Sequence, residues 1–176
     1  MRRNKRNLRD FYQIYLQDWM ASLLLAPLCL YFALNREHYT LLDNADLIIH
    51  EAGHVFFMLL GPFLRIAGGT LMQILLPSIL VGYFYANHYR FGTQVSLFWL
   101  GHHFINISVY AADARARVLP LLGGDKAGHD WANMLGLLGL LDYDQIVGGF
   151  FYVLALLTFV ALLALPRYML KITSRN

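Results

Sequence analysis

The sequence contains little cysteine and little charge. Its single cysteine, Cys29, lies in an apolar run, so an intrachain disulfide and a cysteine-rich metal site are both excluded. Charged residues make up 14% of the 176 residues, whereas a typical soluble domain has about 25%. Hydrophobic residues make up 58% of the chain and are gathered in long blocks. This composition predicts a single all-α membrane domain over residues 1–176, a polytopic integral membrane protein with four to six transmembrane or re-entrant helices.

Positive charge is concentrated before the first apolar run. Of the 14 basic residues, five fall here: Arg2, Arg3, Lys5, Arg6 and Arg9. Such a cluster is typical of the cytoplasmic flank of a membrane span, and we favour this interpretation over a nucleic-acid site. We therefore predict that residues 1–18 form a cytoplasmic flank in a bacterial inner membrane, with lipid as a partner and no nucleic acid. The next apolar run lacks a small-x-small cleavage site, so we expect the flank to be retained.

Five apolar segments are candidates to cross or enter a bilayer, which requires about 20 mostly apolar residues per helix. They are Trp19–Leu34, Ala45–Leu64, Ile66–Ala86, Gln94–Ala112 and Ile146–Leu165. Only Arg65 separates the second segment from the third, close to Gly61-Pro62 and Gly68-Gly69, which predicts a tight hairpin or a broken, partly re-entrant element. Residues 113–145 form a loop with a short apolar piece, for which we expect a re-entrant or interfacial helix.

The basic residues at the two ends of the chain constrain the number of crossings. Five full crossings from a cytoplasmic N-terminus would place Arg167, Lys171 and Arg175 on the outside. Basic flanks prefer the cytoplasm, so this arrangement is disfavoured. We expect an even number of crossings, with one marginal segment that does not cross fully.

The second segment carries the sequence HEAGH, residues 50–54. His50 and His54 are four residues apart and share one helix face, where two imidazoles can bind one divalent metal ion. Glu51 can reach a metal-bound water without binding the metal, which is the H-E-x-x-H arrangement of two zinc ligands and a general base. Ionisable residues in an apolar span usually mark function, so we predict one Zn²⁺ per chain. The alternative is a polar cluster that only joins helices.

Catalytic zinc usually has three protein ligands, so a third ligand must lie elsewhere. The stretch "GGDKAGHDW" places a glycine-flanked histidine beside Asp130, at the start of a short apolar helix. We predict His129 as the third ligand, with Asp125 and Asp113 as the main alternatives.

The fourth segment has a polar face. At 100° per residue, His102, Asn106, Tyr110 and Asp113 fall on one side of the helix, with His103 at the edge. We expect this face to meet the motif helix. This face could join helices by hydrogen bonds, support the metal-binding histidines, or do both. Its possible alternative ligands or supporting residues are His102, His103, Asn106 and Asp113. We also expect Gln73 in the third segment to pair with this face or with a substrate backbone.

The stretch "HEAGHVFFMLLG" in a hydrophobic helix, followed by a Gly-rich apolar segment, resembles the intramembrane zinc metalloproteases of the site-2 protease group. The resemblance covers about the length of the second segment. It implies that His50 and His54 bind zinc, that Glu51 is the base, and that a later membrane element supplies a third ligand. In that group the ligand is an aspartate in an Asp-Gly motif near an Asn-Pro pair, and this chain contains neither pair.

Three functions are consistent with these features. The first is a membrane-embedded zinc metallopeptidase in which Glu51 activates the zinc water to hydrolyse a peptide bond in a membrane-inserted peptide or protein. The second is a metal-binding, non-catalytic subunit or chaperone of a larger membrane complex. The third is a di-iron membrane oxygenase, which the seven scattered histidines disfavour because such enzymes resemble one another in carrying clustered H-x-x-H-H boxes.

Overall fold

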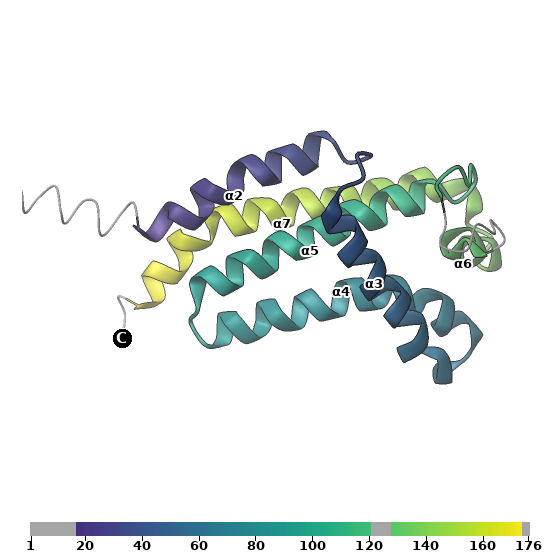
Figure 1. The fold of residues 1–176 in the computed structure, drawn as a ribbon, viewed down its shortest axis with the longest axis horizontal. Coiled ribbons are helices and arrows are strands. Elements are labelled where there is room, and N and C mark those ends of the chain that lie inside the picture. Colours follow the sequence, from purple (N-terminus) through teal and green to yellow (C-terminus); the bar gives the residue numbers. More distant parts are fainter. Residues whose placement is uncertain (1–16, 121–127, 174–176) are drawn as a thin grey trace, which may run out of the picture.

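Six α-helices dominate the residues that the computed structural model describes, which are 17–120 and 128–173 (Figure 1). They are α2 (Gln17–Leu34), α3 (Leu41–Phe56), α4 (Pro62–Ala86), α5 (Arg90–Ala112), α6 (Asp130–Leu137) and α7 (Asp144–Thr173), with the short 3₁₀ helices η2 (Met58–Leu60) and η4 (Leu141–Tyr143). No strand occurs in these two ranges, which confirms the predicted all-α class. Asp125 lies outside the described residues.

Four helices, α2, α4, α5 and α7, run side by side along the long axis of the molecule, whereas α3 crosses α4 and α5 at an angle and α6 lies at one end (Figure 1). Helix α5 is central and packs closely on α7, because glycines remove side chains from the contact. A Cβ atom on Gly101 would overlap the ring of Phe159, and one on Gly148 would lie 2.7 Å from the Ser108 carbonyl oxygen.

The two ends of the bundle have different connections. At the end where α2 and α5 begin and α7 finishes, called here the terminal end, Gln94 donates to the Ser22 hydroxyl at 2.7 Å and to the Leu162 carbonyl at 3.2 Å. Pro166 has no amide hydrogen to pair with that carbonyl, so Gln94 replaces the missing helical bond. At the opposite end, called the loop end, an ion pair of 2.7 Å joins Arg115 to Asp144 at the start of α7.

The predicted second segment, Ala45–Leu64, is not one continuous helix. Helix α3 ends at Phe56 and α4 begins at Pro62. Between them Gly61 has a φ of 102°, a left-handed value that favours glycine, and Pro62 follows in the first turn, where its missing amide hydrogen is harmless. A hairpin was expected here, and the structure places it at residues 57–61, whereas Gly68-Gly69 lie inside α4.

Helix α3 is amphipathic in an unusual sense, because its buried face is polar. The buried residues are Asp43, Asp46, His50 and Gly53, at spacings of three and four. Its outer face is apolar, with Ile48 and Val55 about 70% exposed. The helix is therefore held against the bundle by polar contacts and by close backbone packing rather than by an apolar stripe.

Glycines allow α3 and α4 to approach each other closely. A Cβ atom on Gly53 would overlap the carbonyl oxygen of Gly68, and one on Gly68 would lie 2.6 Å from the carbonyl oxygen of Gly53. A Cβ atom on Gly69 would overlap the imidazole ring of His50. The small residues beside the motif therefore fix where the histidines can lie.

We predict that Gly53→Ala lowers the free energy of unfolding in detergent by about 1–3 kcal/mol, because the added methyl group overpacks the contact between α3 and α4. Gly82→Ala is the matched control in α4, since a Cβ atom there has no neighbour within 4 Å. Denaturant titration followed by circular dichroism measures both variants. Equal stabilities for the two variants would contradict the close-packing account.

Candidate metal centre

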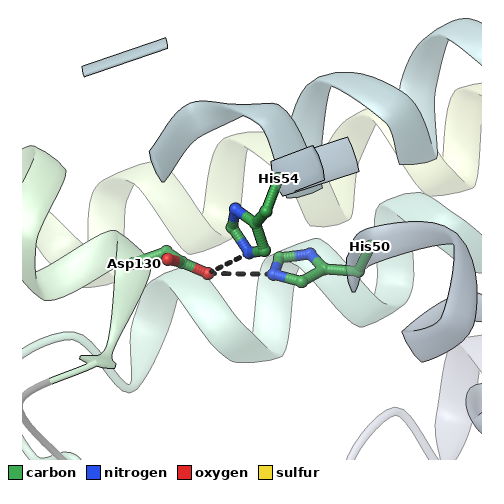
Figure 2. Close-up of side chains that lie close together, drawn as sticks. All are labelled: His50, His54 and Asp130. Atoms are coloured by element: carbon green, nitrogen blue, oxygen red, sulfur yellow. Dashed lines mark hydrogen bonds and ion pairs between the residues drawn. The ribbon is translucent and has the colours of Figure 1, made fainter. Parts of the chain in front are cut away.

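Three side chains from two distant parts of the chain converge at one point (Figure 2). His50 and His54 come from α3, and Asp130 is the first residue of α6. The Oδ2 atom of Asp130 lies 2.9 Å from Nε2 of His50 and 3.2 Å from Nε2 of His54. Ligand atoms bound to one tetrahedral zinc ion are about 3.3 Å apart, given metal–ligand bonds of about 2.0–2.2 Å. The spacing of the three atoms therefore fits a shared metal ion.

The hydrogen bonds of the two histidines fix where their ring protons lie. Nδ1 of His54 is 2.8 Å from the carbonyl oxygen of Arg65, which can only accept, so this nitrogen carries the proton. Nδ1 of His50 is 2.9 Å from Oε1 of Gln73, which also accepts. In each neutral ring, Nε2 then presents a lone pair towards Asp130.

The orientation of the Gln73 amide follows from a chain of hydrogen bonds that begins at Asp43. Its Oδ1 accepts from Nδ2 of Asn106 at 3.2 Å, so the Asn106 oxygen points to Gln73 and accepts from its Nε2 at 3.1 Å. This leaves Oε1 of Gln73 to face His50. The chain passes from α3 through α5 and α4 back to α3, and each member is buried or half-buried. One carboxylate therefore sets the tautomer of a histidine that lies seven residues further along its own helix.

As a result, when both rings are neutral, three electron pairs meet with no donor among them. Burial alone would raise the pKa of Asp130, but hydrogen bonds from ring nitrogens that gain a second proton outweigh it, so the pKa of Asp130 is held at about 2 and that of His54 is raised to about 9. The carboxyl group is thus ionised at neutral pH. Two imidazole lone pairs facing a carboxylate oxygen at these distances repel one another unless a cation lies among them. When no metal is present, a second proton on an imidazole ring can supply the positive charge, and a divalent metal ion would displace that proton.

Asp130 is held in place by Tyr110 and by the packing of α6. The Tyr110 hydroxyl accepts from the Asp130 backbone amide at 3.0 Å and donates to Oδ2 at 3.3 Å. The next turn of α6 inserts Trp131 and Leu135 into the core. The Tyr110 ring also contacts the edge of His50, with ring centroids 5.7 Å apart. Tyr110 therefore contacts both the carboxylate of Asp130 and the ring of His50.

The structure places Asp130, not His129, beside the motif histidines. His129 is the N-cap of α6, and its Nδ1 accepts from the amide of Ala132 at 3.2 Å. Its Nε2 faces Oδ2 of Asp113 at 3.4 Å. Burial lowers the pKa of His129, which favours the neutral ring that such a cap requires. Both ring nitrogens of His129 are thus bonded away from His50 and His54. As the N-cap of α6, His129 instead helps to position Asp130, the residue that follows it.

The polar face of α5 meets the motif helix α3 and Gln73 of α4, as the sequence predicts, and it also meets α6, but its residues do not join the His50–His54 pair. Nδ1 of His102 lies 2.7 Å from Oδ2 of Asp46, and Nδ1 of His103 lies 3.3 Å from the same atom. Asp46 also accepts from the Trp99 indole at 3.0 Å. Asp113 accepts from two backbone amides of the following turn. Asp46 therefore anchors α3 to α5, whereas Asp113 holds the turn that follows α5.

Glu51 lies on α3 beside His50 and is exposed. Its charge helps to raise the pKa of His54, so the carboxylate lies near the site. Glu51 is not part of the ligand group, so a separate role for this carboxylate is geometrically available.

Comparison of the chain with protein-family models, with curated proteins and with solved structures finds no match. Sequence reasoning missed Asp130 as the third member of the group that could hold a metal ion, and the positions of Gln73 and Tyr110 around it. The signals for them were weak: an aspartate in the first turn of a short helix, a lone amide in an apolar segment, and a tyrosine on a polar face.

We predict that Asp130→Asn abolishes stoichiometric zinc binding, because the amide keeps the shape of the side chain but removes its negative charge. His129→Asn is the matched control, since asparagine is also a good N-cap, and it should keep one zinc per chain. Metal analysis of the purified variants after dialysis measures both. Loss of zinc from His129→Asn with retention in Asp130→Asn would reverse the assignment.

We also predict that Gln73→Leu weakens zinc binding by about 10- to 100-fold, because His50 loses the acceptor that fixes its tautomer. Gln94→Leu removes an equally buried glutamine at the terminal end and should leave the affinity unchanged. Competition with a zinc chelator measures the dissociation constants. Equal affinities for the two variants would show that the Gln73 contact does not orient the ligand.

Proposed function

We propose that this chain is a membrane-embedded zinc metallopeptidase that hydrolyses a peptide bond in or near the bilayer. The observation that carries the proposal is the convergence of His50, His54 and Asp130, with Glu51 between the two histidines in the sequence. Two imidazole nitrogens and one carboxylate oxygen form a donor set that suits zinc, and three protein ligands leave a fourth position open, as in catalytic sites. When bound, zinc lowers the pKa of a water molecule to about 7 and polarises a carbonyl group.

The residues of the chain would divide the remaining tasks. Glu51 would accept a proton from the attacking water and pass it to the leaving nitrogen, the work of a general base and then a general acid. Gln73 would keep Nε2 of His50 deprotonated by receiving the hydrogen of Nδ1. Tyr110 would hold the carboxylate of Asp130 against the histidines.

The distribution of apolar side chains supports a membrane location. Among the described residues, two segments are long and apolar enough to span, Pro62–Ala86 and Leu141–Met169, with mean hydropathies of 1.6 and 2.5, and Trp19–Leu34 is a shorter apolar helix. Core helices of soluble proteins also meet this criterion, but they are mostly buried, whereas only 28% and 22% of these windows is buried inside the protein. One face of α7 is an exposed apolar stripe of Ile146, Phe150, Val153, Leu157 and Val160. With polar side chains inside and apolar ones outside, lipid is a better surrounding than water.

The arrangement of the helices supports an even number of crossings. Helices α2, α4, α5 and α7 alternate in direction, and α3, with 16 residues, is the segment that would not cross (Figure 1). Both basic ends of the chain would then lie in the cytoplasm of a bacterial inner membrane. The partners would be lipid and a membrane-inserted peptide or protein, and a larger membrane complex is an alternative setting.

A non-catalytic role is the second candidate, and one observation favours it. The three metal-facing side chains are largely buried and tied to other helices, so a metal there would cross-link α3 to α6 whether or not Glu51 took part. A di-iron oxygenase is less well supported. His102 and His103 are directed to Asp46, and among the described residues the group that could hold a metal has two histidines and one carboxylate.

We predict that Glu51→Gln lowers peptidase activity by about 10²- to 10⁴-fold and leaves zinc content unchanged, because it removes the proton acceptor but no ligand. Glu37→Gln, which changes the only other glutamate in the chain, is the matched control and should retain activity. Cleavage of apolar, membrane-inserted test peptides in proteoliposomes measures the rates. A role as a non-catalytic subunit predicts instead that cells carrying Glu51→Gln behave as wild type.

A further inference from the structure

The candidate metal centre lies near one end of the helix bundle. Tyr110, which holds Asp130, is two residues before the end of α5 at the loop end. Gly69, which faces the His50 ring, is seven residues after the start of α4. At 1.5 Å per residue these positions are about 3 and 10 Å from the loop end, whereas Gly69 is about 25 Å from Ala86, where α4 reaches the terminal end.

Basic residues are concentrated on the opposite side. Nine of the 14 belong to segments that precede α2, begin α5, or lie at and after the end of α7: Arg2, Arg3, Lys5, Arg6, Arg9, Arg90, Arg167, Lys171 and Arg175. Of the other five, Arg36, Arg65, Arg115 and Arg117 belong to the connections and helix starts of the loop end, and Lys126 lies outside the described residues. Two of these five are paired with acidic side chains, Arg36 with Glu37 and Arg115 with Asp144. Excess Lys and Arg in short flanks marks the cytoplasmic side of a membrane protein.

The surface beside the site is apolar. The hairpin that follows His54 exposes Phe56, Met58, Leu59 and Leu60, with Leu59 89% exposed. This hairpin lies at the loop end, next to the start of α4. An apolar edge of this kind is stable where the bilayer meets water, so the hairpin would lie at the membrane surface while Glu51, which is exposed, stays accessible to water.

We propose that the metal centre opens to the non-cytoplasmic half of the membrane, opposite the basic ends of the chain. This inference rests on the proposed peptidase function. The orientation of the site then limits the substrates to apolar polypeptide segments whose scissile bond lies in the outer leaflet or at its surface. Segments that are exposed only on the cytoplasmic side would not reach Glu51.

Thiol labelling tests this orientation independently of activity. Cys29 is the only cysteine and is buried, so Cys29→Ala gives a background for single cysteines at exposed positions. Asp142→Cys reports the loop end, Asn87→Cys reports the terminal end, and Glu51→Cys reports the site itself. Each variant is treated with a membrane-impermeant maleimide in right-side-out and in inside-out bacterial membrane vesicles.

The orientation predicts labelling of Asp142→Cys and Glu51→Cys only in right-side-out vesicles, and of Asn87→Cys only in inside-out vesicles. The reverse pattern, or equal labelling of the two ends in one kind of vesicle, would overturn the orientation. Labelling of Asp142→Cys without labelling of Glu51→Cys in either preparation would overturn the outward opening. If the labelling fits but the wild-type protein cleaves none of the membrane-inserted test peptides, the peptidase function fails while the orientation stands.

Discussion

The structure depends on one electrostatic constraint, the meeting of two imidazole lone pairs and one carboxylate oxygen around Oδ2 of Asp130. The constraint exists because hydrogen bonds behind the rings fix both tautomers: His54 donates to a carbonyl of α4, and His50 donates to Gln73. Without those acceptors, either neutral ring could turn its N–H towards Asp130 and form a hydrogen bond. With them, a neutral ring presents only a lone pair to Asp130, so positive charge must come from a second ring proton or from a metal ion.

The rest of the fold brings these three groups together in the largely buried interior of the helix bundle. Helix α3 turns a polar face to the bundle, and the close contact of Gly53 with Gly68 brings its histidines within reach of α4 and α6. Asp46 fastens the same helix to α5 through Trp99 and His102. Buried polar groups are costly unless they are bonded, so a network of this kind favours one arrangement of the helices over alternatives in which its members lose partners.

Much of this could be predicted within single segments, because helical periodicity acts over short distances in the sequence. It indicated that His50 and His54 share a face, that α5 has a polar side, and that residues after 128 form a short helix. Contacts between segments could not be predicted in the same way. His50 and Asp130 are 80 residues apart, and the choice between His129 and Asp130 depends on which of two neighbouring side chains caps the helix and which points inward. Likewise, Gly61-Pro62 predicted a hairpin or a broken element after the motif, but the apolar pattern of Ala45–Leu64 did not reveal that the helix already ends at Phe56, before the left-handed Gly61.

The most direct test of the account is X-ray absorption spectroscopy of the zinc-loaded protein at the zinc edge. The account predicts one zinc ion per chain with two imidazole ligands at about 2.0–2.1 Å and the remaining ligands oxygen. In Asp130→Asn, the signal of a zinc ion with two imidazoles should disappear. Three imidazoles around one zinc ion, or a protein that binds no zinc although it is folded, would contradict the central claim.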